Sequence, residues 1–248
     1  MKRTDDWFQC SDGTWLSRTA WHPGAGGDRR PGRENAAAAN VRGGVLLVHG
    51  MAEHRQRYER IGSALCERGF LVWAYDQRGH GQSAPESWMR RRIPPHDDWG
   101  RLTEDARELL AGLAQAVSPT PTASANGGAP AFDPTARGGA NGGARPLFIV
   151  GHSMGSLVTR DLLTGPPVEL CGAVLMGTAG DGGLKSRIGL RIAGAVSLVR
   201  PPSAPSRFLN DLTFSGYNTR FSPAASKFDW LSRDPAEVEA YLRDPDCG

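Results

Sequence analysis

Short, almost wholly apolar runs alternate with segments of helical periodicity along most of this chain. Residues 45–48, 70–75 and 147–150 are nearly uniform apolar runs, which is typical of strands buried on both faces of a parallel sheet. Residues 58–68 and 98–117 instead repeat apolar side chains every three or four positions, as one face of an α-helix does. This alternation predicts right-handed β-α-β units and therefore an α/β fold with a mostly parallel sheet flanked by helices.

Shorter patterns extend the predicted sheet. Residues 8–10 and 14–20 flank the turn sequence Ser11-Asp12-Gly13 and predict a β-hairpin. Residues 155–163 predict a helix after the third apolar run, and residues 172–176 predict one further strand. This last strand has no predicted neighbour on its outer side, so we expect an apolar sheet edge that is prone to self-association.

Two segments of biased composition interrupt this pattern. Residues 22–43 and 118–146 are rich in glycine and alanine, and we expect them to be flexible insertions at the surface. After residue 180 the alternation of strands and helices stops. We therefore expect an α/β core over residues 1–179 and a helical cap over residues 180–248.

Two helices are predicted within the cap. Residues 184–200 repeat apolar side chains about every four positions, which predicts an amphipathic helix. Residues 234–242 predict a second helix, with Asp234 as its N-cap and Pro235 at the first helical position. The apolar side of the first helix fits two interpretations, transient contact with a membrane surface or cover of a pocket below it, and we favour the pocket.

Composition and charge exclude several classes of function. The net charge of the 248 residues is 29 − 26 = +3, which is too small and too scattered to indicate a nucleic-acid partner. No stretch reaches the roughly 18 apolar residues of a transmembrane segment. The charged start of the chain is not followed by the apolar run of a signal peptide, so we expect a cytoplasmic protein.

The cysteines add to this picture. They are widely spaced and form no pair or cluster typical of a metal site, so we expect neither a metal nor another cofactor. Cys66 and Cys171 lie in apolar segments and are expected to be buried free thiols, which fits a reducing compartment.

The first candidate catalytic residues follow the third apolar run, residues 147–150. The run is followed directly by Gly151-His152-Ser153-Met154-Gly155, and a strand that passes through Gly-x-Ser-x-Gly into a helix carries a serine nucleophile on a strained turn. The flanking glycines are needed because the turn is too tight for side chains beside the serine. All six histidines lie before Ser153, although a serine of this type normally takes its base from a later histidine.

Two other strand ends carry glycine and polar residues. The segment His49-Gly50-Met51-Ala52-Glu53-His54 follows the first apolar run, and Asp76 to Ser83 follows the second. The carboxyl ends of parallel strands gather at one edge of a sheet, so these loops are expected beside Ser153. We predict that the backbone N–H groups of Met51 and Met154 hold the negative oxygen formed when Ser153 attacks a carbonyl.

The remaining polar residues of these loops have structural interpretations. His49, His54 and His80 could serve as replacement bases, but we favour imidazoles bonded to loop backbone. Glu53 and Asp76 are expected to organise their loops through backbone bonds. His152 lies inside the turn and is expected to be a poor partner for its neighbour.

At these residues the chain resembles the monoacylglycerol lipase and lysophospholipase group of α/β-hydrolases, which is also classed with the serine aminopeptidases. The resemblance covers nearly the whole chain apart from the two insertions. It is carried by His49-Gly50-x-x-Glu53-His54-x-x-Arg57-Tyr58, Asp76-x-x-Gly79-His80-Gly81-x-Ser83 and Gly151-His152-Ser153-Met154-Gly155. It implies an α/β-hydrolase fold, Ser153 as the nucleophile, Met51 and Met154 as the oxyanion hole, and a cap over an acyl-binding pocket.

The chain also departs from that group. Its members continue past the cap into two more strands, which deliver the acidic residue and the histidine of the catalytic triad. This sequence stops at Gly248, so we expect the last strands of the sheet and both triad partners to be missing. Asp181 follows the strand at 172–176, where some α/β-hydrolases keep an alternative acid.

Two functional hypotheses follow. The leading one is a serine hydrolase of carboxylic esters that acts through an acyl-enzyme on Ser153, with acyl esters of glycerol or lysophospholipids as small-molecule substrates. The alternative is a C-terminally truncated or degenerate member of the group with little or no turnover, at most a binding protein for acyl ligands.

Overall fold

The computed structural model describes most of the predicted core and the end of the predicted cap. The described residues are 1–24, 41–84, 99–118, 145–180, 216–221 and 223–247, with scattered positions between 183 and 208. Most of the predicted insertions at 22–43 and 118–146, most of the predicted helix at 184–200, and Asp181 lie outside the described residues.

One six-stranded sheet forms the centre of the molecule, in the order β1-β2-β4-β3-β5-β6. The strands are β1 (Lys2–Gln9), β2 (Trp15–His22), β3 (Gly43–Val48), β4 (Phe70–Tyr75), β5 (Leu147–His152) and β6 (Gly172–Met176). The four strands from β3 to β6 are parallel, whereas β1 and β2 form an antiparallel hairpin whose second strand pairs with β4. The predicted, mostly parallel sheet is therefore confirmed.

The hairpin is longer than the apolar pattern predicted. It begins at Lys2 rather than Phe8, because charged residues of β1 have partners across the strand pair. Arg18 donates two hydrogen bonds to the Asp6 carboxylate at 2.7 and 2.6 Å, and the Thr19 hydroxyl donates to Asp5 at 2.5 Å. Opposite charges that face each other across strands stabilise a sheet without burying apolar surface.

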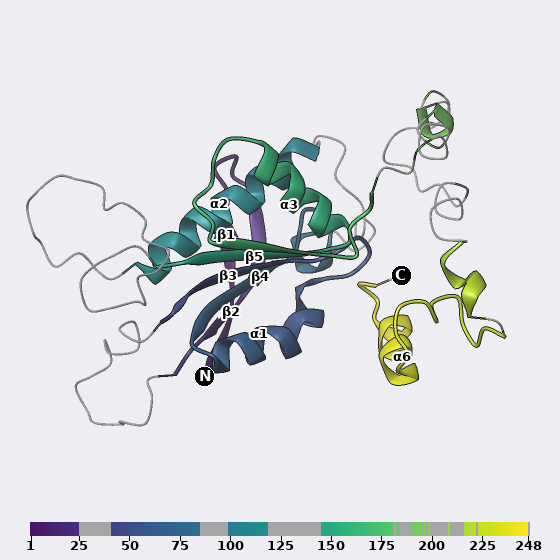
Figure 1. Ribbon diagram of the computed structural model, residues 1–248, viewed down its shortest axis with the longest axis horizontal. Coiled ribbons are helices and arrows are strands. Elements are labelled where there is room, and N and C mark those ends of the chain that lie inside the picture. Colours follow the sequence, from purple (N-terminus) through teal and green to yellow (C-terminus); the bar gives the residue numbers. More distant parts are fainter. Residues whose placement is uncertain are drawn as a thin grey trace, which may run out of the picture.

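Helices cover both faces of the sheet (Figure 1). Helix α1 (Glu59–Glu67) lies on one face, and α2 (Trp99–Val117) and α3 (Met154–Thr164) lie together on the other. Strand β3 shows why both faces are apolar, because Val45 and Leu47 pack in the cluster under α1 while Leu46 and Val48 pack in the cluster under α2 and α3. Successive residues of a strand point to opposite faces, and burial of each such side chain stabilises the fold by roughly 1.5–3 kcal/mol.

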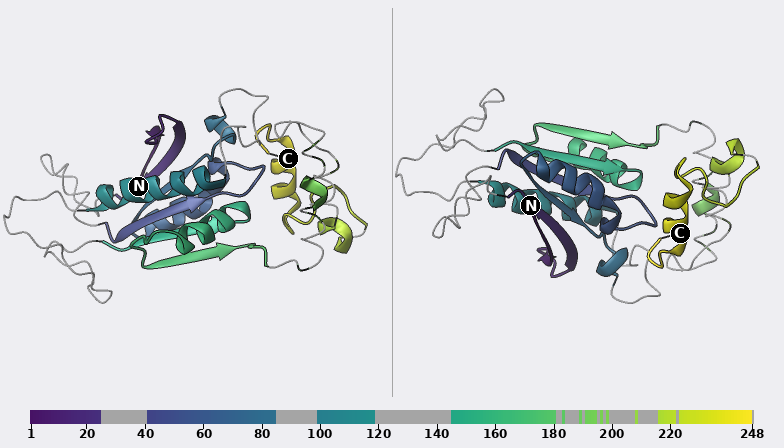
Figure 2. Two further views of the ribbon diagram at one scale, coloured as in Figure 1. Left: turned by 90° about the horizontal axis from the view of Figure 1, so that it is seen from above. Right: turned by 90° about the horizontal axis from the view of Figure 1, so that it is seen from below.

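The C-terminal segment lies beyond the carboxyl ends of the parallel strands (Figures 1 and 2). It contains the short 3-10 helix η5 (Tyr217–Arg220) and helix α6 (Pro235–Arg243). The predicted N-cap of α6 is confirmed, because the Asp234 carboxylate accepts a hydrogen bond from the Ala236 N–H at 3.0 Å. None of the described helices is long and apolar enough to cross a membrane.

Strand β6 forms one edge of the sheet that the described residues build. Val174, Leu175 and Met176 on this strand are exposed, and 52% of the Val174 surface is accessible. Cys171, just before the strand, is also exposed, so the expectation of a buried thiol was wrong there, whereas Cys66 is buried as predicted. Cys171 is exposed because it precedes β6, which has one neighbouring strand among the described residues.

Candidate active site

Ser153 lies in the turn between β5 and α3. Its backbone angles are φ 50° and ψ −117°, and only one other non-glycine residue among those described, Ala52, has a positive φ. L-residues avoid this region because the Cβ crowds the backbone, so the turn is strained. The Ser153 N–H donates to the Met176 carbonyl at 2.8 Å, and the residue is exposed. The predicted strained turn is therefore present.

The glycines on either side of Ser153 are required by close backbone packing. A Cβ on Gly151 would lie 2.4 Å from the Gly155 carbonyl oxygen and 2.5 Å from the Thr159 hydroxyl. A Cβ on Gly155 would lie 2.2 Å from the Val48 carbonyl oxygen and 2.5 Å from that of His49. The two glycines thus allow α3 to begin directly against the end of β3.

The loop after β3 lies against this turn. A Cβ on Gly50 would be 3.0 Å from the Ser153 Cβ and 3.2 Å from the His152 Nδ1. Met51 is the next residue and is 44% exposed. Met154 is buried and is the first residue of α3, so its N–H has no acceptor inside the helix. The structure therefore brings the two segments of the predicted oxyanion hole together.

Glu53 and His152 form a hydrogen-bonded pair at the base of this site. The His152 Nδ1 lies 2.7 Å from the Glu53 Oε1, and the same oxygen accepts the Gly50 N–H at 2.6 Å. The hydrogen bond to Glu53 raises the pKa of His152. Burial alone would raise the pKa of Glu53, but the hydrogen bonds from His152 and from the Gly50 N–H outweigh it and lower the pKa to about 2. Glu53 organises its loop through a backbone bond, as predicted, and also contacts His152, which was not predicted.

Asp76 holds the loop after β4 to the loop after β3. This fully buried carboxylate accepts the Arg55 N–H at 2.8 Å and the Gln82 N–H at 2.9 Å, which confirms the predicted backbone bonds. It also pairs with the Arg55 guanidinium at 2.5 Å. Sequence reasoning missed Arg55, and the available signal was a carboxylate at the end of a buried strand, which needs a cation or several hydrogen-bond donors.

A second buried ion pair fixes the same loop to α2. The Arg78 guanidinium donates two hydrogen bonds of 2.6 Å to the Asp105 carboxylate, in the bidentate geometry that arginine favours. Asp105 lies on the inner face of α2, where the helical pattern gives no hint of its partner. Both ion pairs hold the loops around the site rather than lining it.

His49 and His80 are structural, as predicted. The His49 Nδ1 lies 2.6 Å from the Gly50 carbonyl oxygen, and its Nε2 accepts the Gln77 N–H at 2.9 Å, which requires a neutral ring. The His80 Nδ1 lies 3.0 Å from the Arg78 carbonyl oxygen. Burial lowers the pKa of both rings, that of His80 to about 4. Both nitrogens of His49 are therefore occupied, whereas the Nε2 of His80 is buried without a hydrogen-bond partner among the described residues.

His54 is also structural, but its partner was predicted wrongly. Its Nε2 lies 2.8 Å from the Oδ2 of Asp244, at the end of α6, rather than against loop backbone. The Tyr241 hydroxyl donates to the Ala52 carbonyl at 3.0 Å, so α6 is bound to the loop beside Ser153 by two contacts. These partners lie about 190 residues apart in the chain, and only the tertiary fold brings them together.

His54, Asp244 and Cys247 offer three ligand atoms within 4.8 Å of one another, which is the spacing of a metal site. Burial raises the pKa of the Cys247 thiol to about 12, and Arg57 lies beside it. Two of the three residues, His54 and Asp244, are already joined by a hydrogen bond.

No base is in place for Ser153 among the residues that the structure describes. No described residue forms a hydrogen bond with its hydroxyl, and the sequence has no histidine after position 152. Asp181, the alternative acid considered above, lies outside the described residues.

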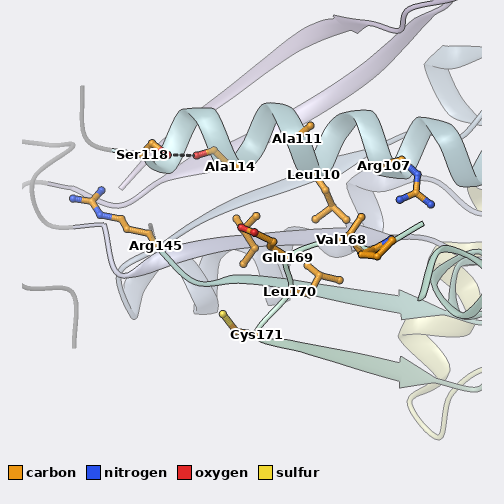
Figure 3. Close-up of a pocket in the computed structure, with 12 residues that line it drawn as sticks. Arg107, Leu110, Ala111, Ala114, Ser118, Arg145, Val168, Glu169, Leu170 and Cys171 are labelled. Atoms are coloured by element: carbon orange, nitrogen blue, oxygen red, sulfur yellow. Dashed lines mark hydrogen bonds between the residues drawn. The ribbon is translucent and has the colours of Figure 1, made fainter. Parts of the chain in front are cut away.

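The structure also contains a cavity away from these residues (Figure 3). It has a volume of about 250 Å³ and lies between α2 and residues 167–171. Leu147, the first residue of β5, lines it, whereas Ser153 follows the last residue of that strand. The cavity is therefore at the opposite end of the strand from the candidate nucleophile and includes no predicted site residue.

Comparison with known proteins gives consistent results. The family model described as serine aminopeptidase, S33, matches residues 39–126 and 135–248. A monoacylglycerol lipase of Mycolicibacterium smegmatis is 29% identical over 82% of this chain and 56% of its own length. The human monoglyceride lipase is 23% identical over 81% of this chain and 51% of its own length. The chain thus spans about half the length of the curated relatives that it matches.

Solved structures show the same fold. A thermostable carboxyl esterase from Bacillus coagulans superimposes with a TM-score of 0.71 at 23% identity, over 100% of this chain and 67% of that one. A soluble variant of the monoglyceride lipase from Saccharomyces cerevisiae gives a TM-score of 0.61 at 18% identity, over 100% of this chain and 63% of that one. These similarities place the described sheet and helices in the α/β-hydrolase fold.

Proposed function

We propose that this chain, which belongs to the serine aminopeptidase, S33, family of α/β-hydrolases, hydrolyses carboxylic acyl esters through Ser153. One observation carries the proposal. Ser153 is exposed on a strained turn at the end of a parallel strand, and the loop after β3 is so near that a Cβ on Gly50 would lie 3.0 Å from the Ser153 Cβ. Acyl transfer requires a hydroxyl beside backbone N–H groups, and the closeness of Ser153 to the loop that carries Met51 supports such an arrangement.

The proposed reaction has two steps. The Ser153 Oγ attacks the ester carbonyl carbon, its proton passes through a base to the departing oxygen, and the alcohol leaves as the acyl-enzyme forms. Water then attacks the acyl-enzyme, the carboxylic acid leaves, and the serine recovers its proton. The Met51 and Met154 N–H groups would hold the carbonyl oxygen in both steps. In support, no described residue accepts a hydrogen bond from the Met51 N–H.

We further propose acyl esters of glycerol or of lysophospholipids as the substrate class. The similarity to proteins named monoacylglycerol lipase and monoglyceride lipase supports this choice. Residues 180–248 would cover the acyl group as a cap, and the position of α6 beyond the strand ends agrees with that role. Contact of this cap with a membrane surface is the alternative use of its apolar side.

A second candidate function is binding of acyl ligands with little turnover. It is favoured by the absence of a base hydrogen-bonded to Ser153 among the described residues. Loss of a triad histidine costs on the order of 10⁶ in kcat, although a rate roughly 10³–10⁴ above water survives from the oxyanion hole and binding.

Hydrolysis of short-chain p-nitrophenyl esters by residues 1–248 separates the two candidates. The hydrolase proposal predicts turnover that Ser153→Ala abolishes, together with covalent labelling of Ser153 by a fluorophosphonate. Turnover that persists in Ser153→Ala would overturn the assigned nucleophile. Absence of both turnover and labelling, with retained binding of an acyl glycerol, would establish the binding protein instead.

A further inference from the structure

Glu53 is placed where three segments of the site meet. Its Oε1 lies 2.6 Å from the Gly50 nitrogen, 2.7 Å from the His152 Nδ1 and 3.1 Å from the Tyr58 hydroxyl. Its other oxygen lies 3.4 Å from the Arg57 Nε. The donors come from the loop after β3, from the last residue of β5 and from the short 3-10 helix η2 (Arg55–Tyr58).

The two strained residues of the site are each next to a member of this network. Ala52, with φ 59°, directly precedes Glu53, and Ser153, with φ 50°, directly follows His152. Such conformations persist only where the surrounding structure holds them. A hydrogen bond between Glu53 and His152 therefore joins the two strained turns at the positions where each needs support.

The groups on both sides of this bond lie close to Gly50. The position of a Cβ on Gly50 lies 2.7 Å from the Glu53 Oε1, 3.0 Å from the Ser153 Cβ and 3.2 Å from the His152 Nδ1. The carboxylate, the imidazole and the Ser153 side chain thus surround one point beside the Gly50 backbone. Glu53 is only 7% exposed, so water does not substitute readily for a lost partner.

We propose that Glu53 is a positioning residue that fixes the loop carrying Met51 to the turn carrying Met154, and so sets the spacing of the two oxyanion donors. The inference rests on the proposed function for its catalytic consequence, whereas the coupling of the two turns is a structural claim. His152 is the other positioning residue, because its hydrogen bond to the Glu53 carboxylate holds the turn that carries Ser153 in place.

If the Glu53–His152 pair only stabilised the fold, its loss would have a different effect. Loss of such a pair lowers the stability of the whole domain without moving one turn relative to the other. Glu59 provides the matched control, because it is also a glutamate that accepts a hydrogen bond from a buried side chain, the Trp21 Nε1 at 3.1 Å, but on α1.

The test compares Glu53→Gln with Glu59→Gln in the 1–248 chain. Backbone amide resonances of Met51 and Met154 are followed by NMR, together with the rate at which a fluorophosphonate labels Ser153. We expect Glu53→Gln to shift both amides and to slow labelling by about 10- to 100-fold, which is less than the roughly 10²–10³-fold cost of removing an oxyanion donor altogether. Glu59→Gln should do neither.

Variants at His152 keep the test decisive if Glu53→Gln does not fold. His152→Asn places an amide nitrogen near the position of Nδ1 and should retain both amide positions, whereas His152→Ala should shift both. If the Met154 amide does not move when the pair is broken, or if Glu59→Gln slows labelling equally, the inference is wrong.

The same experiment distinguishes failure of the proposed function from failure of the inference about Glu53. A wild-type chain that is not labelled at all would reject the hydrolase, while the joint movement of the Met51 and Met154 amides would still decide whether Glu53 couples the two turns.

Discussion

Replacing Ser153 by glycine should stabilise the fold relative to replacing it by alanine, because glycine adopts φ 50° without the crowding that a Cβ causes. Both substitutions remove the hydroxyl and abolish acyl transfer. Any difference between them therefore reports the backbone strain of the turn and not the chemistry of the serine.

The magnitude follows from two opposing terms. A non-glycine residue in a sparsely populated backbone region costs about 1–3 kcal/mol, which glycine avoids. Glycine loses about 0.5–1 kcal/mol relative to alanine, because its unfolded chain is freer. The difference leaves Ser153→Gly about 1 kcal/mol more stable. A domain of 150–250 residues gains about 2–4 °C in Tm for each kcal/mol, so a rise of that size is expected.

Urea and thermal unfolding followed by circular dichroism measure this difference. Ser63, in the middle of α1, provides the control, because glycine in a helix interior should be about 1 kcal/mol less stable than alanine. The order of the two variants should therefore reverse between the two positions. If glycine is the less stable residue at position 153 as well, the turn is not strained and the argument from its geometry fails.

Three further predictions concern the packing, the charges and the edge of the sheet. Gly155→Ala places a Cβ 2.2 Å from a backbone carbonyl oxygen of β3. It should lower the free energy of unfolding, measured by urea titration, by about 1–3 kcal/mol. Gly180→Ala is the control, because the space around Gly180 is open and the free energy of unfolding should change little. The raised pKa of His152 means that its contribution to stability is complete below pH 6.5 and is lost as pH rises through the folded-state pKa. The lowered pKa of Glu53 means that its contribution is present above pH 4.5 and is lost as pH falls toward about 2. Urea midpoints of wild type and Glu53→Gln should therefore converge as pH falls toward about 2, and their difference should be smaller above the folded-state pKa of His152 than below it, so a constant difference would contradict this. We expect the exposed edge strand β6 to associate with itself and Val174→Lys to reduce that association in sedimentation velocity, so a monomeric wild type would reject the prediction.

The elements of the core could be predicted from the sequence because their signals are local. A strand buried on both faces needs apolar side chains at every position, as in residues 45–48, and an amphipathic helix needs them every three or four positions. The serine turn was also predictable, because Gly151 and Gly155 are the residues that such close packing requires. Asp234 was recognised as an N-cap for the same reason, since its partner is two residues away.

The partners of the buried polar groups were decided by the tertiary structure alone. Glu53 and His152 are 99 positions apart, and His54 and Asp244 are 190 apart, so no local pattern links them. Which carboxylate meets which imidazole depends on how the strands are ordered in the sheet and where α6 returns to it. Periodicity is a property of neighbouring residues and is written in the sequence. The pairing of charges in a site depends on the path of the whole chain, because a buried polar group bonds to whatever donor the fold brings to it.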